Sequence, residues 1–266
     1  MFYFYLFFEF SVIPIFFVIS RFGVRFERLQ SAVYMFFYTL SFSLPFLIFL
    51  FSFDYNFKSL RFLLSKFVYI SHLDYFFVFF SIFMFFVRIP SFFLHIWLPK
   101  AHVEAPSSGS MILAGLLLKL GVYGLMIFLD FGFFQINCFY EFYFFGGIWG
   151  SVLASFVCFR QSDLKKMVAY MSIMHIGICI SSLFTFYSIS IFSVISMIVA
   201  HGFSSSLIFY SLACFYERIH SRRIILVKGG LSVIPLYFLF LCLVVFSNIS
   251  VPPSLNFFLN YFYLLV

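Results

Sequence analysis

Ionisable side chains inside long apolar runs are the residues of this sequence that could do chemistry. Lys119 lies deepest, in a stretch that is otherwise Leu, Gly, Ala, Ile and Met, and the other four are Glu9, Arg88, His175 and His201. A lysine in hydrocarbon costs about 2.5–3.5 kcal/mol even on the most lenient insertion scale, so Lys119 must face protein or water. Such residues are by default candidates for moving ions or protons.

Each of these residues also has a purely structural interpretation. Glu9 could anchor a basic residue of a partner, and Arg88 could form a permanent pair or extend toward the membrane surface. Arginine effectively never deprotonates, so a switching role suits Lys119 better than Arg88. A lone histidine in a helix is commonly a core residue whose ring nitrogens have hydrogen-bond partners. Two on neighbouring helices beside a lysine favour a relay, because imidazole titrates at about pH 6.5.

The composition indicates that membrane-spanning elements position these residues. The chain has 266 residues and a net charge of +7, and 64% of it is hydrophobic but only 9% charged, whereas about a quarter of a soluble domain is charged. Runs near 20 apolar residues are typical of transmembrane helices. We predict an all-α integral membrane protein, a single domain 1–266, with about eight spans: 2–20, 30–53, 75–98, 105–129, 137–159, 165–187, 189–214 and 231–266.

Prolines interrupt two of the predicted spans. Pro90 lies in the third and Pro252-Pro253 in the eighth, and a proline inside a helix removes a backbone donor and breaks or kinks it. Broken helices at membrane depth are tolerated where they line a cavity, and transporters use them in this way. Glycines near Lys119 allow neighbouring helices to approach closely: Gly115, Gly121 and Gly124.

The basic residues fall unequally on the two predicted faces. Eleven lie in connections that follow odd-numbered spans, and three lie on the opposite face: Lys58, Arg61 and Lys66. By the positive-inside rule the N-terminus points outward and the basic connections face the cytoplasm or matrix. The apolar run begins at Phe2 without a basic region or a small-residue cleavage site, so we expect no cleavable leader.

Metal and redox chemistry find little support in the sequence. The five cysteines show no CxxC spacing and lie in or beside apolar segments, which favours small buried side chains over disulfides, zinc or iron–sulfur ligation. The histidines lack a carboxylate neighbour at ligand spacing, so no metal site is expected. No flavin or nucleotide fingerprint occurs.

Seven motifs follow one another between Phe8 and the C-terminus: HIWLPKAHVEAP, LLLKLGVYG, RQSDLKKMVAY, MSIMHIG, VAHGFSSSLIF, YERIHSR and VPPSLNFF. Their order resembles the chain 4 family of mitochondrial-type NADH–quinone oxidoreductase (respiratory complex I), an antiporter-like family of the membrane arm. The resemblance implies that Glu9 is the glutamate of a first half-channel and that Arg88 replaces its partner lysine on a broken helix. Lys119 matches the central lysine, and His175 and His201 match the histidines of the polar axis.

The chain departs from the family pattern at two of these positions and in length. Arg88 keeps the positive charge opposite Glu9, but arginine does not release a proton as readily as the family's lysine would. Asn260 stands at the place of the family's second glutamate and cannot titrate. By the resemblance the chain lacks about four N-terminal and two C-terminal helices of the inverted-repeat fold. Residues 1–130 would form the first half-channel, and 131–266 the connecting region and an incomplete second half-channel.

The resemblance implies a multi-pass subunit of the mitochondrial inner membrane, with its N-terminus toward the intermembrane space, that helps translocate protons during electron transfer from NADH to ubiquinone. It would carry no cofactor, since flavin, iron–sulfur clusters and quinone belong to other subunits. Its expected partners are other membrane-arm subunits, lipids, and separate chains that replace the missing helices, with no nucleic acid. The alternatives are a structural remnant that no longer pumps and a subunit of a multisubunit Na+/H+ antiporter, against which WLPKAHVEAP and YERIHSR argue.

Overall fold

The structure is a computed structural model that describes residues 2–23, 26–57, 81–130, 137–185, 187–227, 232 and 234–257. Regular structure in these residues is helical, apart from one isolated antiparallel bridge between Asp163 and Arg223. The all-α prediction is confirmed. Asn260, Lys58, Arg61 and Lys66 lie outside the described residues.

Six segments are long and apolar enough to cross a membrane: Phe2–Phe22, Arg28–Ile48, Ser107–Leu129, Glu141–Phe159, Leu164–Leu183 and Ser188–Ile219. They correspond to six of the eight predicted spans. The helices that build them are α1 (Phe2–Phe10), α2 (Val12–Phe22), α3 (Arg28–Phe57), α6 (Ser107–Ile112), η2 (Leu113–Leu117), α7 (Leu118–Asp130), α8 (Asn137–Phe159), α9 (Leu164–Leu183) and α10 (Ser188–Ile219).

The other two predicted spans are the two that contain the breaking prolines. Residues 81–88 are helical, the chain then leaves the helix through Pro90, and α5 (Trp97–Glu104) begins beyond the break. The Trp97 indole donates a hydrogen bond of 2.9 Å to the Val87 carbonyl, which satisfies a buried acceptor beside the break, as an apolar environment requires. Near the C-terminus, α12 (Pro235–Asn248) ends before the non-helical segment that contains Pro252-Pro253.

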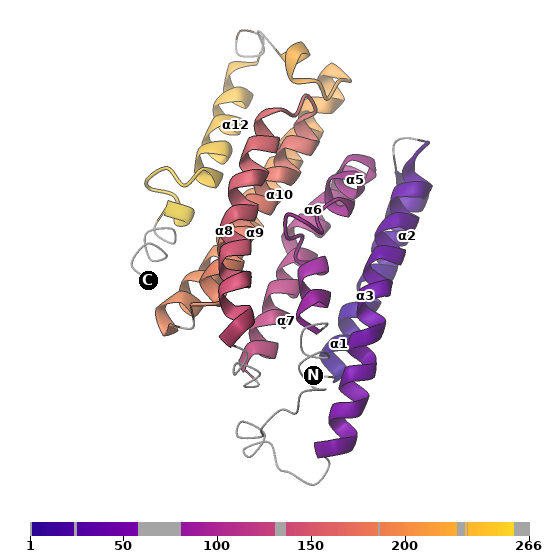
Figure 1. The fold of residues 1–266 in the computed structure, drawn as a ribbon. Coiled ribbons are helices and arrows are strands. Elements are labelled where there is room, and N and C mark those ends of the chain that lie inside the picture. The colour runs from indigo at the N-terminus through magenta and orange to yellow at the C-terminus, as the bar shows by residue number, and fades with distance from the viewer. Residues whose placement is uncertain are drawn as a thin grey trace.

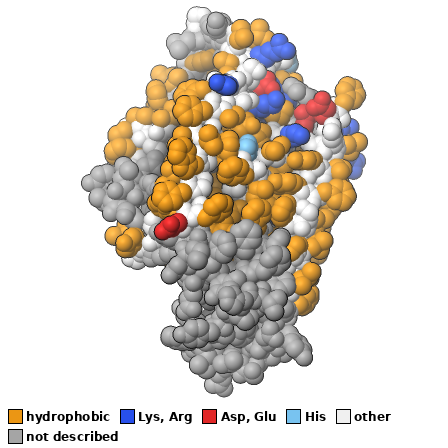
Figure 2. All heavy atoms as spheres, viewed as in Figure 1, with side chains coloured by type: hydrophobic (Ala, Val, Ile, Leu, Met, Phe, Trp, Pro, Cys, Tyr) orange, Lys and Arg blue, Asp and Glu red, His pale blue; other side chains and the backbone are white. Residues whose placement is uncertain are grey.

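The helices pack side by side, as Figure 1 shows, with α8, α9 and α10 forming one group, α1, α2 and α3 forming another, and α5, α6 and α7 lying between them. Large apolar side chains fill the interior between them, and many others point outward: Phe7, Phe17, Phe37, Phe93, Phe142 and Phe156. Hydrophobic side chains cover much of the face drawn in Figure 2. An apolar exterior around a packed interior suits a protein that lies in lipid.

Glycines bring several of these helices into close contact. A Cβ atom at Gly147 on α8 would lie 2.8 Å from the Gly177 carbonyl oxygen of α9, and one at Gly124 would lie 2.8 Å from the rings of Phe4 and Phe85. At Gly115 the nearest atoms would be 3.9 Å away, an ordinary distance. Of the three glycines singled out near Lys119, Gly124 thus permits a close approach and Gly115 does not require one.

One end of the bundle gathers basic residues. The C-terminal ends of α8 and α10 and the N-terminal end of α9 lie there, because successive helices are antiparallel, and Lys and Arg side chains cluster at that end in Figure 2. Two basic side chains bind main-chain carbonyls around the C-terminal end of α5: Arg222 Nη1 donates to Val103 at 2.8 Å, and Lys165 Nζ donates to Ala105 at 3.0 Å. These bonds tie the end of α5 to α9 and to the segment that follows α10.

Candidate functional site

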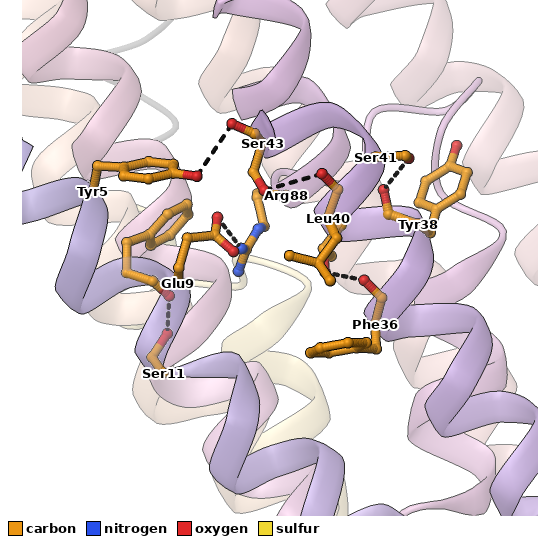
Figure 3. A network of polar contacts seen from close by, with 11 residues as sticks. Tyr5, Glu9, Ser11, Phe36, Tyr38, Leu40, Ser41, Ser43 and Arg88 are labelled. Carbon is orange, nitrogen blue, oxygen red and sulfur yellow. Dashed lines mark hydrogen bonds and ion pairs between the residues drawn. The ribbon is translucent and has the colours of Figure 1, made fainter. Parts of the chain in front are cut away.

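An ion pair joins α1 to the helix that Pro90 interrupts. Arg88 Nη2 lies 2.5 Å from Glu9 Oε1, and the side chains are only 7% and 18% exposed (Figure 3). The Arg88 guanidinium also lies over the Phe8 ring, 4.4 Å from its centroid. Two charges so far from water require this pairing, because an unpaired buried charge is strongly unfavourable. The structure therefore brings Glu9 and Arg88 together.

A second polar contact lies one helical turn from Glu9. Tyr5 precedes Glu9 by four residues, so both side chains lie on one face of α1. The Tyr5 hydroxyl donates a hydrogen bond of 3.2 Å to the main-chain carbonyl of Ser43 on α3, as Figure 3 shows. This bond ties α1 to α3 beside the ion pair and fixes the face on which the carboxylate lies.

Lys119 follows a short π-helix, η2, in the middle of the fourth predicted span. Its Nζ donates a hydrogen bond to the carbonyl of Ala114, which lies within η2. π-Bulges widen a helix by one residue and are frequent at functional sites. Lys119 is partly buried, and it lines a cavity with side chains of α9 and α10. The lysine is thus surrounded by protein along that side, as its charge requires.

Two histidines share this cavity with Lys119. His175 on α9 and His201 on α10 are 4% and 3% exposed, and their ring centroids lie 5.1 Å apart. The cavity has a volume of about 10 Å3, close to the lower limit for a single water molecule. Lys119, His175 and His201 therefore form a compact group of ionisable side chains from three helices.

The helix α7 connects this group to the ion pair. A Cβ atom at Gly121, two residues beyond Lys119, would lie 3.0 Å from Ile89 Cγ1 and 3.5 Å from Arg88 Cβ. The side of α7 that carries Gly121 thus packs against the break, while Lys119 lies in the cavity with the histidines. The five predicted ionisable residues lie on neighbouring helices, and Asn260 lies outside the described residues.

Asn248 is a residue of this group that the sequence analysis missed. It ends α12, is 1% exposed, and its Oδ1 lies 3.2 Å from His201 Nδ1 and accepts a hydrogen bond of 3.1 Å from Ser204 Oγ. The signal that could have revealed it is an amide in an apolar helix, four residues before the double proline. α12 therefore contributes a side chain to the site.

His102 is a second residue without a predicted role. It lies in α5, is completely buried, and stacks on Phe209 of α10 with ring centroids 4.7 Å apart and planes within 8°. Neither ring nitrogen has a hydrogen-bond partner within the described part of the chain. The motif HIWLPKAHVEAP is one of those that carry the family resemblance, but it assigned no role to His102. The stacking joins α5 to α10.

A membrane bundle with two proline-broken segments and buried ionisable groups from successive helices is the architecture of an antiporter-like membrane protein. The family of NADH:quinone oxidoreductase/Mrp antiporter transmembrane proteins matches residues 1–266. The chain therefore belongs to this family.

Relatives with assigned names support the same placement. The chain is 43% identical over 263 residues to NADH-ubiquinone oxidoreductase chain 4 of Locusta migratoria, which covers 95% of this chain and 56% of the relative. It is also 43% identical over 264 residues to the same chain of Ceratitis capitata, covering 96% and 57%. The chain thus spans a little more than half the length of these relatives.

Solved structures share the fold. A chain of respiratory complex I from Thermus thermophilus with bound NADH matches with a TM-score of 0.89 at 22% identity, over 100% of this chain and 57% of that chain. A chain of the Mrp complex from Dietzia sp. DQ12-45-1b matches with a TM-score of 0.88 at 15% identity, over 100% and 50%. The predicted antiporter-like fold is confirmed.

Proposed function

We propose that this chain is a membrane-arm subunit of a NADH:ubiquinone oxidoreductase and that it conducts protons during electron transfer from NADH to quinone. The observation that carries the proposal is the group of Lys119, His175 and His201 around one small cavity. The sequence identity with chain 4 relatives favours this complex over a Na+/H+ antiporter. The chain resembles the Mrp complex in fold but has only 15% sequence identity with it.

The residues divide into groups that can exchange a proton and groups that cannot. Lys119 and the two histidines can bind and release protons, so they form the proposed path. Arg88 keeps its charge. Its pair with Glu9 is therefore a permanent ion pair, in which the two residues do not pass a proton back and forth. In this scheme residues 1–130 hold the first half-channel and 131–266 the connecting region and part of the second.

The energy for transport comes from neighbouring subunits in this scheme. The chain itself holds no cofactor, and electrons pass through flavin, iron–sulfur clusters and quinone on other subunits. Charge or shape changes in adjacent membrane-arm subunits then act on the buried ionisable groups. Separate polypeptides against α1 and against the segment from residue 251 onward are further proposed partners, together with lipids.

Orientation gives a first test. The basic end of the bundle, with the connection α8–α9 and the segment after α10, is proposed to face the mitochondrial matrix, with the N-terminus toward the intermembrane space. Trypsin added to inside-out inner-membrane vesicles should cut at Arg160–Lys166 and near Arg222, whereas in right-side-out vesicles these sites should stay intact. Cleavage of the two segments from the intermembrane side would contradict the orientation.

Purification of the assembled complex tests the function itself. An affinity tag on this chain should recover subunits that contain flavin and iron–sulfur clusters from solubilised membranes, together with NADH:ubiquinone reductase activity. Inhibiting that activity should stop proton uptake by the same preparation after reconstitution in liposomes. Recovery of a complex that exchanges Na+ for H+ without NADH oxidation would favour the antiporter alternative.

A further inference from the structure

The amide of Asn248 has a defined orientation in its buried site. Its Nδ2 lies 4.0 Å from the thioether sulfur of Met171, and its Oδ1 faces His201 and Ser204. A thioether sulfur can accept a hydrogen bond but cannot donate one. If the amide were turned over, its carbonyl oxygen would face sulfur and remain unsatisfied in a buried place, which costs about 1–3 kcal/mol. Met171 thus keeps the amide oxygen directed at His201.

This orientation determines which nitrogen of His201 carries the proton. An amide oxygen only accepts hydrogen bonds, so the contact of 3.2 Å with His201 Nδ1 requires a hydrogen on Nδ1. A neutral imidazole has one N–H and one acceptor nitrogen. His201 Nε2 is therefore the acceptor, and it is buried without a hydrogen-bond partner among the residues described.

We infer that Asn248 is a positioning residue that fixes the Nδ1–H tautomer of His201 and so makes Nε2 the single atom through which this ring takes up and releases a proton. The inference rests on the proposed function. The other ionisable groups at the cavity are Lys119 on α7 and His175 and Cys179 on α9. A donor among them loses a proton, a new N–H bond forms at His201 Nε2, and the ring becomes an imidazolium.

The proton on Nδ1 stays in place throughout this step. Its acceptor, the amide oxygen of Asn248, is too weak a base to take it, so the imidazolium can return to neutrality only by releasing the proton from Nε2. Proton entry and exit thus both occur on the side of the ring away from α12. A residue that only fastened α12 to α10 would have no such effect on the ring.

The test compares substitutions in the assembled complex in membranes. Asn248→Leu keeps the size of the side chain but removes the acceptor, whereas Asn248→Asp keeps an oxygen for Nδ1–H. Ser204→Ala is the matched control, because it removes the other α10–α12 hydrogen bond at the same oxygen. Isotope-edited infrared spectra with labelled histidine, after subtraction of the spectrum of His201→Phe, report the tautomer. Proton uptake per NADH oxidised reports transport.

We expect the Nδ1–H signature in the unchanged chain, in Asn248→Asp and in Ser204→Ala, and a mixture of tautomers in Asn248→Leu. Translocation through the chain should fall at least about tenfold in Asn248→Leu and much less in Ser204→Ala. An Nε2–H signature in the unchanged chain would overturn the inference, and this measurement does not depend on the assembly of any Asn248 variant. An equal loss of translocation in Ser204→Ala would also overturn the inference. The loss of a hydrogen bond between α10 and α12 would then explain the effect of both substitutions.

The outcome also separates this inference from the proposed function. If His201→Phe lowers translocation and Asn248→Leu does not, the role of Asn248 fails and the proton path stands. If His201→Phe translocates protons normally, His201 lies outside the path, and the inference about transport fails with it. The tautomer in the unchanged chain is still decided by the spectrum.

Discussion

Replacing Lys119 with methionine is expected to abolish proton translocation through this chain while the complex still assembles and oxidises NADH. Methionine matches the length and flexibility of the lysine stem but cannot bind a proton. Removing a positioned acid–base group typically slows proton transfer by about 10²–10⁴-fold. Assembly should survive because the variant removes a buried charge that is costly in a membrane. Proton uptake per NADH oxidised, in liposomes that contain the purified complex, is the measurement.

The matched control for this experiment is Lys166→Met. Lys166 is 43% exposed, and its Nζ lies 3.7 Å from Asp163 Oδ2 at the surface, where an ion pair contributes about 0–1 kcal/mol. The same substitution there should leave proton uptake unchanged. Normal uptake by Lys119→Met, in a complex that assembles, would refute the relay and would favour the structural-remnant alternative.

Breaking the Glu9–Arg88 pair is expected to give the largest loss of stability. Glu9→Leu leaves the guanidinium of Arg88 buried without a counter-charge, and removing one partner of such a pair costs about 3–5 kcal/mol. The temperature at which the assembled complex disappears from native gels should fall accordingly. The Tyr5 hydrogen bond to Ser43 remains, so the loss can be assigned to the unpaired charge.

The double variant Glu9→Leu/Arg88→Met provides the control. Both charges are then absent, and replacing a whole buried pair with apolar residues of similar size is often neutral or stabilising. We expect the double variant to recover most of the assembly temperature that the single variant loses. Recovered stability together with low proton uptake would show that Glu9 also acts in transport. A double variant as unstable as the single one would contradict the pairing argument.

Hydrophobic run length and proline position made much of the fold predictable. Six of the eight predicted spans became helical segments near their predicted bounds, because helices satisfy their own backbone in lipid. Pro90 and Pro252-Pro253 marked the breaks because proline cannot donate to a helix. Glu9 and Arg88 could be selected individually, since charges are rare in such runs, and their contact between α1 and the broken helix agrees with the expected pairing.

Features that depend on contacts between distant segments could not be predicted. The π-helix before Lys119 consists of ordinary apolar residues, so LAGLL gives no signal for it. Asn248 could not be predicted as a site residue because an uncharged amide in an apolar run is a weaker signal than a charge. Its role depends on its contacts with His201 and Ser204 of α10. His102 acquires its surroundings from Phe209, more than a hundred residues later in the chain. Asn260 lies outside the described residues, so the expectation for that position stays a prediction.

The hydrogen bond from Trp97 to the Val87 carbonyl has a mechanical consequence. It joins Trp97, the first residue of α5, to the residue before Arg88, so it links the two sides of the break at Pro90. At the other end of α5, Lys165 and Arg222 donate hydrogen bonds to the main-chain carbonyls of Ala105 and Val103. We therefore expect a displacement of α9, or of the segment after α10, at the basic end to reach the Arg88 guanidinium through α5 and the Trp97 indole.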